Sequence, residues 1–240
     1  MFDTLIGIIA ANWYLYLLAA VIAYLIGSIN PAVIVTKMFT KGKSDIREMG
    51  SGNAGFTNVL RSVGKVPAII TIVCDALKCI LAVFVAYFLF KWFASVPVED
   101  EWFRRCFYTG VKYFAGVFCI LGHAFPLYFH FKGGKGIVTA AALMLASDWR
   151  AFLLILGSFL IVFIFGRIIS LASITGAVMY APSTFLVSFV FDHLLTKPCL
   201  WYVICSTACA LIIGIFAIVM HKDNIKRLLR GEEKKIHAKK

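Results

Sequence analysis

The sequence predicts an all-α, polytopic membrane protein with about seven transmembrane helices. Hydrophobic residues make up 61% of the 240 residues and the mean hydropathy is +0.89, whereas soluble domains average about 45–50% apolar residues. These residues are gathered in long runs, and short polar or basic connections separate the runs. Because a spanning helix needs about 20 mainly apolar residues, we expect a single membrane-embedded domain over residues 1–240, with a basic tail at residues 221–240.

The apolar runs define the expected helices in order. They lie at residues 5–29, 66–90, 111–129, 137–146, 151–165, 168–191 and 199–220. The start of the chain lacks the basic region of a cleavable signal peptide, so we expect the first run to be a permanent span. The fourth run is short for a full span. It is a tilted or partial helix or part of a longer helix that begins near Gly134, and five or six spans is the alternative count.

The basic residues orient the chain and narrow its possible partners. Most Lys and Arg residues fall in the first, third, fifth and last connections, which predicts an external N-terminus and a cytoplasmic C-terminus. The basic tail could also serve lipid contact alone. The net charge of +12 forms no basic stripe with interleaved aromatics, so we expect no nucleic acid as partner. The seven cysteines show no metal spacing, and we expect neither a metal site nor a cofactor.

Four polar segments fall on the predicted cytoplasmic side. They lie at residues 50–61, 131–136, 167–173 and 221–230. Each carries groups that bind phosphate oxygens, so we expect them to converge on one anionic-substrate site at the bilayer surface.

The first segment is rich in glycine and small polar residues. Glycine allows backbone conformations that are closed to other residues, so successive N–H groups can form an anion-binding nest. The candidate residues are Gly50, Ser51, Gly52, Asn53, Gly55, Thr57, Asn58 and Arg61. An ordinary turn with helix-capping residues is the alternative interpretation.

The second segment places Lys132 and Lys135 among three glycines, immediately before an apolar helix. Gly133 and Gly134 add a flexible backbone to these two charges, an arrangement that suits phosphate. It is not a Walker A loop, because Gly136 stands where that motif needs Ser or Thr for Mg²⁺. A positive-inside anchor with a flexible hinge is the alternative interpretation.

The remaining candidates are single side chains near helix ends. Helical spacing puts His221 and Asn224 on one face, although such a tail is often only an amphipathic surface helix. Ser173 begins a span and is equally consistent with an interhelical hydrogen bond. Inside the runs, Asp75 and Lys78 lie three residues apart and are expected to pair with each other or with a loop. His123 is expected to hydrogen-bond across the bundle.

Together these segments resemble the acyl-phosphate-dependent glycerol-3-phosphate acyltransferase family of bacterial membranes. The matching motifs lie at residues 27–29, 45–58, 121–136, 170–174 and 221–233. They occur in order and cover nearly the whole chain. Asn30 before Pro31 and a long connection at residues 99–105 are small departures that do not touch the proposed site.

The resemblance implies a seven-helix enzyme of the bacterial inner or plasma membrane, active at the cytoplasmic face. It would transfer a fatty acyl group from acyl phosphate to the sn-1 hydroxyl of glycerol-3-phosphate, giving lysophosphatidic acid and inorganic phosphate. The implied catalytic residues are Ser51, Lys135, His221 and Asn224. The implied phosphate-binding residues are Gly52, Asn53, Gly55, Thr57, Arg61, Gly133, Gly134 and Ser173.

The chemistry agrees with this assignment, and two other classes stay open. Acyl phosphate is already activated, so positioning and oxyanion stabilisation suffice without a covalent enzyme intermediate. His221 or the substrate's own phosphate would accept the hydroxyl proton. An organic-phosphate transporter and a non-catalytic lipid-binding scaffold are the alternatives.

Overall fold

A computed structural model describes residues 2–195 and 200–235 of the chain. All regular secondary structure in this part is helical, which confirms the predicted all-α class. The chain divides into two compact units, Met1–Ser147 and Asp148–Lys240. The expected single domain with a basic tail stays a prediction.

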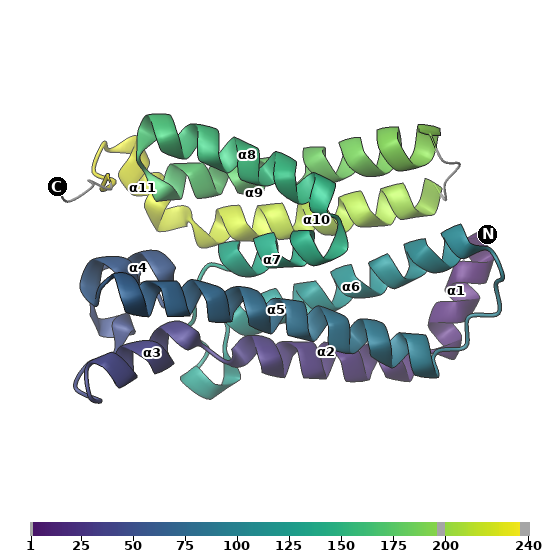
Figure 1. Ribbon diagram of the computed structural model, residues 1–240, viewed down its shortest axis with the longest axis horizontal. Helices are drawn as coiled ribbons and strands as arrows, with labels where there is room; N and C mark the ends of the chain where they lie inside the picture. The colour runs from purple at the N-terminus through teal and green to yellow at the C-terminus, as the bar shows by residue number, and fades with distance from the viewer. Residues whose placement is uncertain (1, 196–199, 236–240) are drawn as a thin grey trace. The chain divides into compact units, whose positions relative to one another are not determined.

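The first unit contains seven α-helices and two short 3-10 turns among its described residues. They are α1 (Phe2–Ala11), α2 (Trp13–Ser28), α3 (Pro31–Phe39), η1 (Ile46–Glu48), α4 (Phe56–Ser62), α5 (Lys65–Phe93), α6 (Glu101–Ala124), η2 (Leu127–Phe129) and α7 (Ile137–Ser147). Helices α2, α5 and α6 lie side by side and form the centre of this unit (Figure 1).

Six helical segments of the described residues are long and apolar enough to cross a membrane. They are Trp13–Phe39, Lys65–Phe93, Glu101–Phe129, Trp149–Gly166, Ile169–Leu194 and Leu200–Met220. The remaining predicted run is α7, whose 11 residues extend about 16 Å at 1.5 Å per residue, against a hydrocarbon core about 30 Å thick. It begins at Ile137, after Gly136 at φ 77°, so the alternative of a longer helix from near Gly134 is wrong. The number of crossings and the side of each terminus stay predictions.

The first span differs from its predicted bounds of residues 5–29. The chain breaks at Asn12, which separates α1 from α2, and the span continues into α3. The Asn12 amide nitrogen donates to the carbonyls of Ile8 (2.8 Å) and Ser95 (3.0 Å), and its oxygen accepts from the Ser95 N–H at 3.0 Å. This buried side chain satisfies backbone groups of the α1–α2 break and of the α5–α6 connection, which is the reason the helix can stop there.

Helices α2 and α6 approach each other closely through two glycines. A Cβ atom on Gly27 would collide with the carbonyl oxygen of Cys119, and one on Gly122 would collide with the carbonyl oxygen of Tyr24. Small residues allow such approaches between membrane helices, where van der Waals packing drives association. The Gly-Ser-Ile motif near residue 27 therefore supplies a helix crossing.

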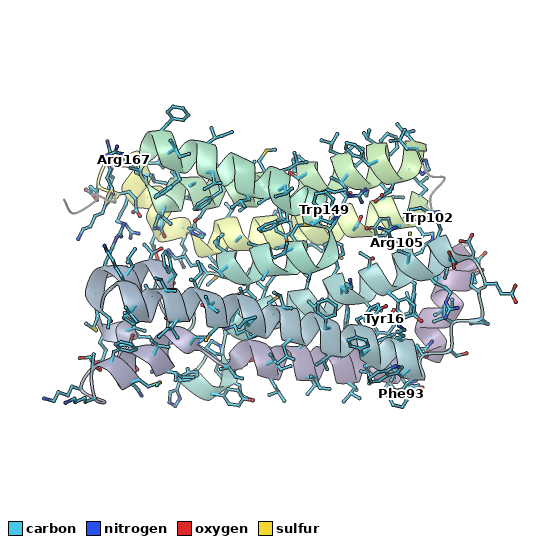
Figure 2. The ribbon with its side chains drawn as sticks, in the orientation of Figure 1. Tyr16, Phe93, Trp102, Arg105, Trp149 and Arg167 are labelled. Atoms are coloured by element: carbon cyan, nitrogen blue, oxygen red, sulfur yellow. The ribbon has the colours of Figure 1, made fainter. Side chains whose placement is uncertain are left out.

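Aromatic side chains fill the end of the first unit at which α5 ends. The Tyr16 ring, labelled in Figure 2, lies edge-on to Phe90 and Phe114 with centroid distances of 4.6 and 5.1 Å. Trp92 and Phe93 are exposed at the end of α5, where aromatic residues mark a membrane–water interface. This end of the bundle is packed by aromatic rings, while the polar loops lie at the end where α4 begins.

The second unit is built from α8 (Trp149–Gly166), α9 (Ile169–Leu186), the π-helical segment η3 (Val187–Leu194), α10 (Leu200–Met220) and α11 (Lys222–Leu229). Helix α9 packs against both α8 and α10, and the three run alongside one another in Figure 1. Residue 199, the first of the predicted last run, lies outside the described residues.

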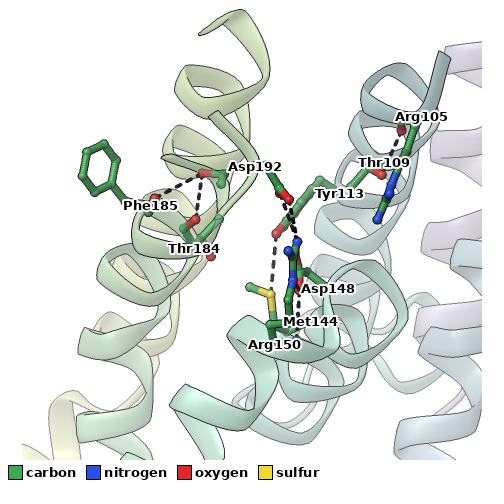
Figure 3. Close-up of polar contacts among 10 residues, drawn as sticks. Arg105, Thr109, Tyr113, Met144, Asp148, Arg150, Thr184, Phe185 and Asp192 are labelled. Carbon is green, nitrogen blue, oxygen red and sulfur yellow. Dashed lines mark hydrogen bonds and ion pairs between the residues drawn. The ribbon is translucent and has the colours of Figure 1, made fainter. Parts of the chain in front are cut away.

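An ion-pair cluster fixes the π-helical segment on the start of α8 (Figure 3). Asp148 caps α8 and accepts two hydrogen bonds from the Arg150 side chain, at 3.0 and 2.7 Å. The same guanidinium donates to both Asp192 oxygens, at 2.9 and 3.0 Å. Charges this close to apolar spans are stable only when paired, so we assign the cluster a structural role.

Candidate active site

The first polar loop of the first unit is held in shape by Asn58. Its side-chain nitrogen donates to the carbonyls of Ile46 (3.0 Å) and Met49 (2.9 Å), and its oxygen accepts from the Ser51 N–H at 3.1 Å. Asn58 lies in the first turns of α4 and is buried. The side chain that looked like one more donor for an anion is therefore the internal support of the loop.

Two glycines are required by the path of this loop. Gly50 and Gly52 have φ angles of 56° and 71°, a region that side chains disfavour. A Cβ on Gly50 would also collide with the Asn58 side chain, and one on Gly52 would lie 3.2 Å from the Arg47 carbonyl oxygen. These glycines let the chain fold tightly over the support that Asn58 provides.

Arg47 joins the first loop to the second. Its guanidinium donates to both oxygens of Asp45 (3.0 and 2.7 Å) and, through Nη1, to the Phe129 carbonyl at 2.8 Å. The hydrogen bond from this side chain, against a smaller opposing effect of burial, lowers the pKa of Asp45. The bidentate pair thus holds the guanidinium in the geometry that reaches across to the second loop.

The second loop folds back on the end of α6. The N–H groups of Gly133 and Gly134 donate to the carbonyls of Ala124 (3.2 Å) and His123 (3.1 Å). A Cβ on Gly134 would collide with the His123 ring and lie 2.7 Å from the carbonyl oxygen of Ala54. Gly134 therefore lies between α6 and the first loop, and close packing is the role that the geometry gives to both glycines.

The first unit brings together the predicted residues of its two loops. Ser51, Gly52 and Arg61 are exposed, and Asn53, Gly55, Thr57, Gly133 and Lys135 are partly exposed, whereas Gly134 is buried. Thr57 lies in the first turn of α4 and Arg61 in its last turn. The result is an accessible surface of hydroxyl, amide and cationic groups carried by two mutually fixed loops.

In the second unit, the Glu233 carboxylate binds the predicted site residue Asn224 together with two neighbours, Ser170 and Arg227. One carboxylate oxygen accepts from the Asn224 amide at 2.9 Å and from the Ser170 hydroxyl at 2.8 Å. The other accepts from Arg227 Nε at 2.6 Å. Because Ser170 belongs to α9 and Asn224 to α11, this carboxylate fixes α11 against the start of α9. The turn between α8 and α9, at Arg167 with φ 54°, is labelled in Figure 2.

His221 stands at the start of α11 with its ring orientation defined. The ring is buried, and Nδ1 lies 2.7 Å from the carbonyl oxygen of Ala217. A carbonyl oxygen only accepts, so Nδ1 carries the proton and Nε2 bears the lone pair of the neutral ring. A histidine in this tautomer can accept a proton or a hydrogen bond through Nε2. The remaining predicted residue of the second unit, Ser173, is buried in α9.

The comparisons with known proteins follow the same segments. The family model described as glycerol-3-phosphate acyltransferase matches residues 17–231. The chain belongs to the glycerol-3-phosphate acyltransferase family. A relative of that name from Francisella tularensis subsp. novicida is 37% identical over 219 residues, covering 91% of this chain and 92% of its own. Another from Nostoc sp. is 38% identical over 236 residues, covering 95% and 96%.

Two solved structures share the fold of this acyltransferase family member. Both are crystal structures of PlsY (YgiH), an integral membrane glycerol 3-phosphate acyltransferase. The glycerol 3-phosphate form has a TM-score of 0.70 and 33% identity, covering 92% of this chain and 96% of that one. The lysophosphatidic acid form has a TM-score of 0.69 at the same identity, covering 92% and 95%. The predicted family and the polytopic membrane class are thereby confirmed.

The amino-acid sequence does not single out Arg47 or Glu233 of this acyltransferase as parts of the site, and it presents Asn58 only as a possible anion-binding side chain. All three residues lie within the motifs that carry the family resemblance, but local spacing does not reveal their supporting contacts. Each acts on a backbone or side-chain partner that lies in another element, so only the folded chain shows its contacts. Among the described residues, no group of three or more His, Cys, Asp or Glu side chains could hold a metal ion.

We expect Glu233→Gln to loosen α11 in this acyltransferase and to change its acid stability. Burial by itself would raise the pKa of Glu233, but hydrogen bonds from Arg227, Asn224 and Ser170 outweigh it and lower the pKa below the ordinary 4.5. A depressed pKa stabilises the fold above the unfolded-state value and loses that contribution as the pH falls through the folded-state value. The unfolding temperatures of the wild type and of Glu233→Gln should therefore differ near neutral pH and converge below about pH 4.5. A gap that stays constant down to about pH 3.5 would contradict this role for the carboxylate.

Proposed function

We propose that the protein transfers a fatty acyl group from acyl phosphate to the sn-1 hydroxyl of glycerol-3-phosphate. The products are lysophosphatidic acid and inorganic phosphate, so the reaction begins phospholipid synthesis. The observation that carries this assignment is family membership over nearly the whole chain. The two PlsY forms, with glycerol 3-phosphate and with lysophosphatidic acid, agree with this acceptor and this product.

The described residues offer what the reaction needs. Each substrate carries a phosphate, and cations are supplied by Arg61, in the last turn of α4, and by Lys135, on the second loop. The acceptor hydroxyl attacks the acyl carbonyl carbon, the bond from that carbon to the phosphate oxygen breaks, and inorganic phosphate leaves. Because the donor is already activated, orientation and electrostatic stabilisation of the developing oxyanion account for catalysis.

His221 holds glycerol-3-phosphate in this proposal, and its Nε2 competes with the leaving phosphate for the hydroxyl proton. The bond from Nδ1 to Ala217 orients the ring for either role. Asn224 is held by Glu233 and offers a second polar contact on the same helix. Ser51, Thr57 and Ser173 contribute hydroxyl groups to substrate binding.

The setting of the reaction is the bacterial inner membrane, with the active site facing the cytoplasm. The long apolar spans keep the acyl chain in lipid, whereas the phosphates remain at the polar loops. The predominance of Lys and Arg in alternate connections supports this orientation.

A two-substrate assay tests the function. Purified protein in detergent is given acyl phosphate and glycerol-3-phosphate, with and without chelator, and release of phosphate and formation of lysophosphatidic acid are measured. We expect both products in equal amounts and no effect of the chelator. Uptake of glycerol-3-phosphate into liposomes without phosphate release would instead favour a transporter.

Lys135→Arg separates a specific phosphate contact from a simple surface charge. Arginine keeps the charge but replaces a compact ammonium by a planar fork. We expect kcat/KM to fall about tenfold, equivalent to about 1.4 kcal/mol of transition-state binding. Lys132→Arg, at an exposed residue of the same loop, is the matched control. Equal activities of wild type and Lys135→Arg would favour the role of a non-specific basic anchor.

A further inference from the structure

Three ionisable side chains are buried together inside the spans of the first unit. Asp75 is 2% exposed, Lys78 6% and His123 4%. They lie within the segments Lys65–Phe93 and Glu101–Phe129. Ionisable groups at such positions are costly and mark functional places in membrane proteins, yet the proposed reaction gives these three no part.

Lys78 is at the centre of this cluster. Its ammonium group lies 2.8 Å from Asp75 Oδ1, 3.0 Å from His123 Nδ1 and 2.7 Å from the carbonyl oxygen of Ile29. That carbonyl ends α2 where the first span breaks before Pro31. A break in a spanning helix must have its backbone groups satisfied by protein, and Lys78 does this while it binds the two side chains.

Asp75 completes the hold on the His123 ring. Its Oδ1 lies 3.1 Å from the same Nδ1 atom that faces Lys78. The ring nitrogen donates to Asp75 in one tautomer and accepts from Lys78 in the other. In both, the ring is held at one edge by the same two residues of α5.

The opposite side of His123 faces the second polar loop. The His123 carbonyl accepts the Gly134 N–H at 3.1 Å. A Cβ on Gly134 would collide with His123 Nε2 and would lie 2.7 Å from the Ala54 carbonyl of the first loop. The ring is therefore the surface on which Gly134 lies, and the next residue is Lys135.

We propose that Asp75 and Lys78 are positioning residues that act through the His123 ring on the loop carrying Lys135. This inference rests on the proposed function, since it assigns Lys135 a phosphate of the substrates. The charges of Asp75 and Lys78 orient the His123 ring rather than stabilise the fold, because a buried ion pair commonly adds little to stability compared with apolar side chains of similar size. A held ring gives the loop one position, and misplacement by about 1 Å can cost as much as 10²-fold in rate.

The test combines kinetics with amide exchange on the full-length protein. Lys78→Met removes the ammonium group and keeps a long, unbranched side chain. We expect kcat/KM to fall about tenfold and amide exchange of a peptide covering residues 127–137 to accelerate. Combined with Lys135→Arg, the loss should be smaller than the product of the two single losses, because both changes act on one contact. Lys78→Arg, which retains a cation, should recover part of the activity.

Two further variants keep the test interpretable. Lys112→Met is the control, since Lys112 is also partly buried in α6 and donates to the Ala146 carbonyl at 3.1 Å, away from the loops. Asp75→Asn with Lys78→Met removes both charges, so no unpaired charge is left to unfold the protein. Wild-type loop exchange and kcat/KM in this folded double variant would overturn the proposal. Wild-type protein that releases no phosphate at all would instead refute the proposed function.

Discussion

Replacing His221 with alanine is expected to lower kcat/KM by about 10²- to 10⁴-fold, the range ascribed to general acid–base catalysis. The structure gives the reason, because the Nδ1 bond to Ala217 (2.7 Å) leaves the lone pair of the neutral ring on Nε2. Turnover is measured with both substrates at matched levels of folded protein. Full turnover of His221→Ala would show that His221 neither holds the acceptor nor takes its proton.

A second substitution at the same position separates the two roles. Glutamine can retain hydrogen bonds but cannot act as the base, so His221→Gln should keep substrate affinity and lose kcat if Nε2 takes the proton. Recovery of most of kcat would assign the proton to the leaving phosphate. Lys222→Ala is the control, because Lys222 is the exposed neighbour in α11, and its activity should stay close to that of the wild type.

Gly134→Ala is expected to reduce kcat/KM by about 10²-fold. The added methyl group has no space between the His123 ring and the Ala54 carbonyl. The second loop must therefore move away from α6 or from the first loop, and Lys135 moves with it. Overpacking of this kind also destabilises a fold by about 1–3 kcal/mol, so activity is compared at a temperature where both proteins remain folded.

Gly110→Ala is the matched control for this change. Gly110 lies in α6 of the same unit, and an added Cβ would meet nothing within 4 Å. Alanine is the better helix former by about 1 kcal/mol, so this variant should be at least as stable as the wild type and equally active. Wild-type activity of Gly134→Ala as well would show that the loop tolerates displacement and that its packing does not position Lys135.

The helical class and most helix positions followed from hydropathy, because a spanning helix must be apolar along its length. The residues at which the helices begin and end are less predictable. Asn12 divides the first run by binding the backbone of Ser95, a partner more than eighty residues away. The fourth apolar run is visibly short for a full span, but the start of α7 after Gly136 depends on a left-handed backbone angle.

The candidate site shows the same division. Charge and glycine content indicated two phosphate-binding loops, and the motifs gave the family. The expected pairing of Asp75 with Lys78 and the expected hydrogen bond of His123 across the bundle are confirmed. The arrangement that links them to the second loop was not foreseen, since nothing in local spacing relates Lys78 to Ile29 or Gly134 to Ala54.

The amino-acid sequence is enough to predict the membrane class, the family and the residue types available for phosphate chemistry. These properties reside in composition, in apolar run length and in ordered motifs, all of which are local along the chain. The residues that act as supports can be told from the others only in the folded chain. Asn58 and Glu233 bind partners within their own units, and Gly134 is a glycine because two elements meet there. Such roles depend on distances between atoms far apart in the sequence, which packing alone fixes.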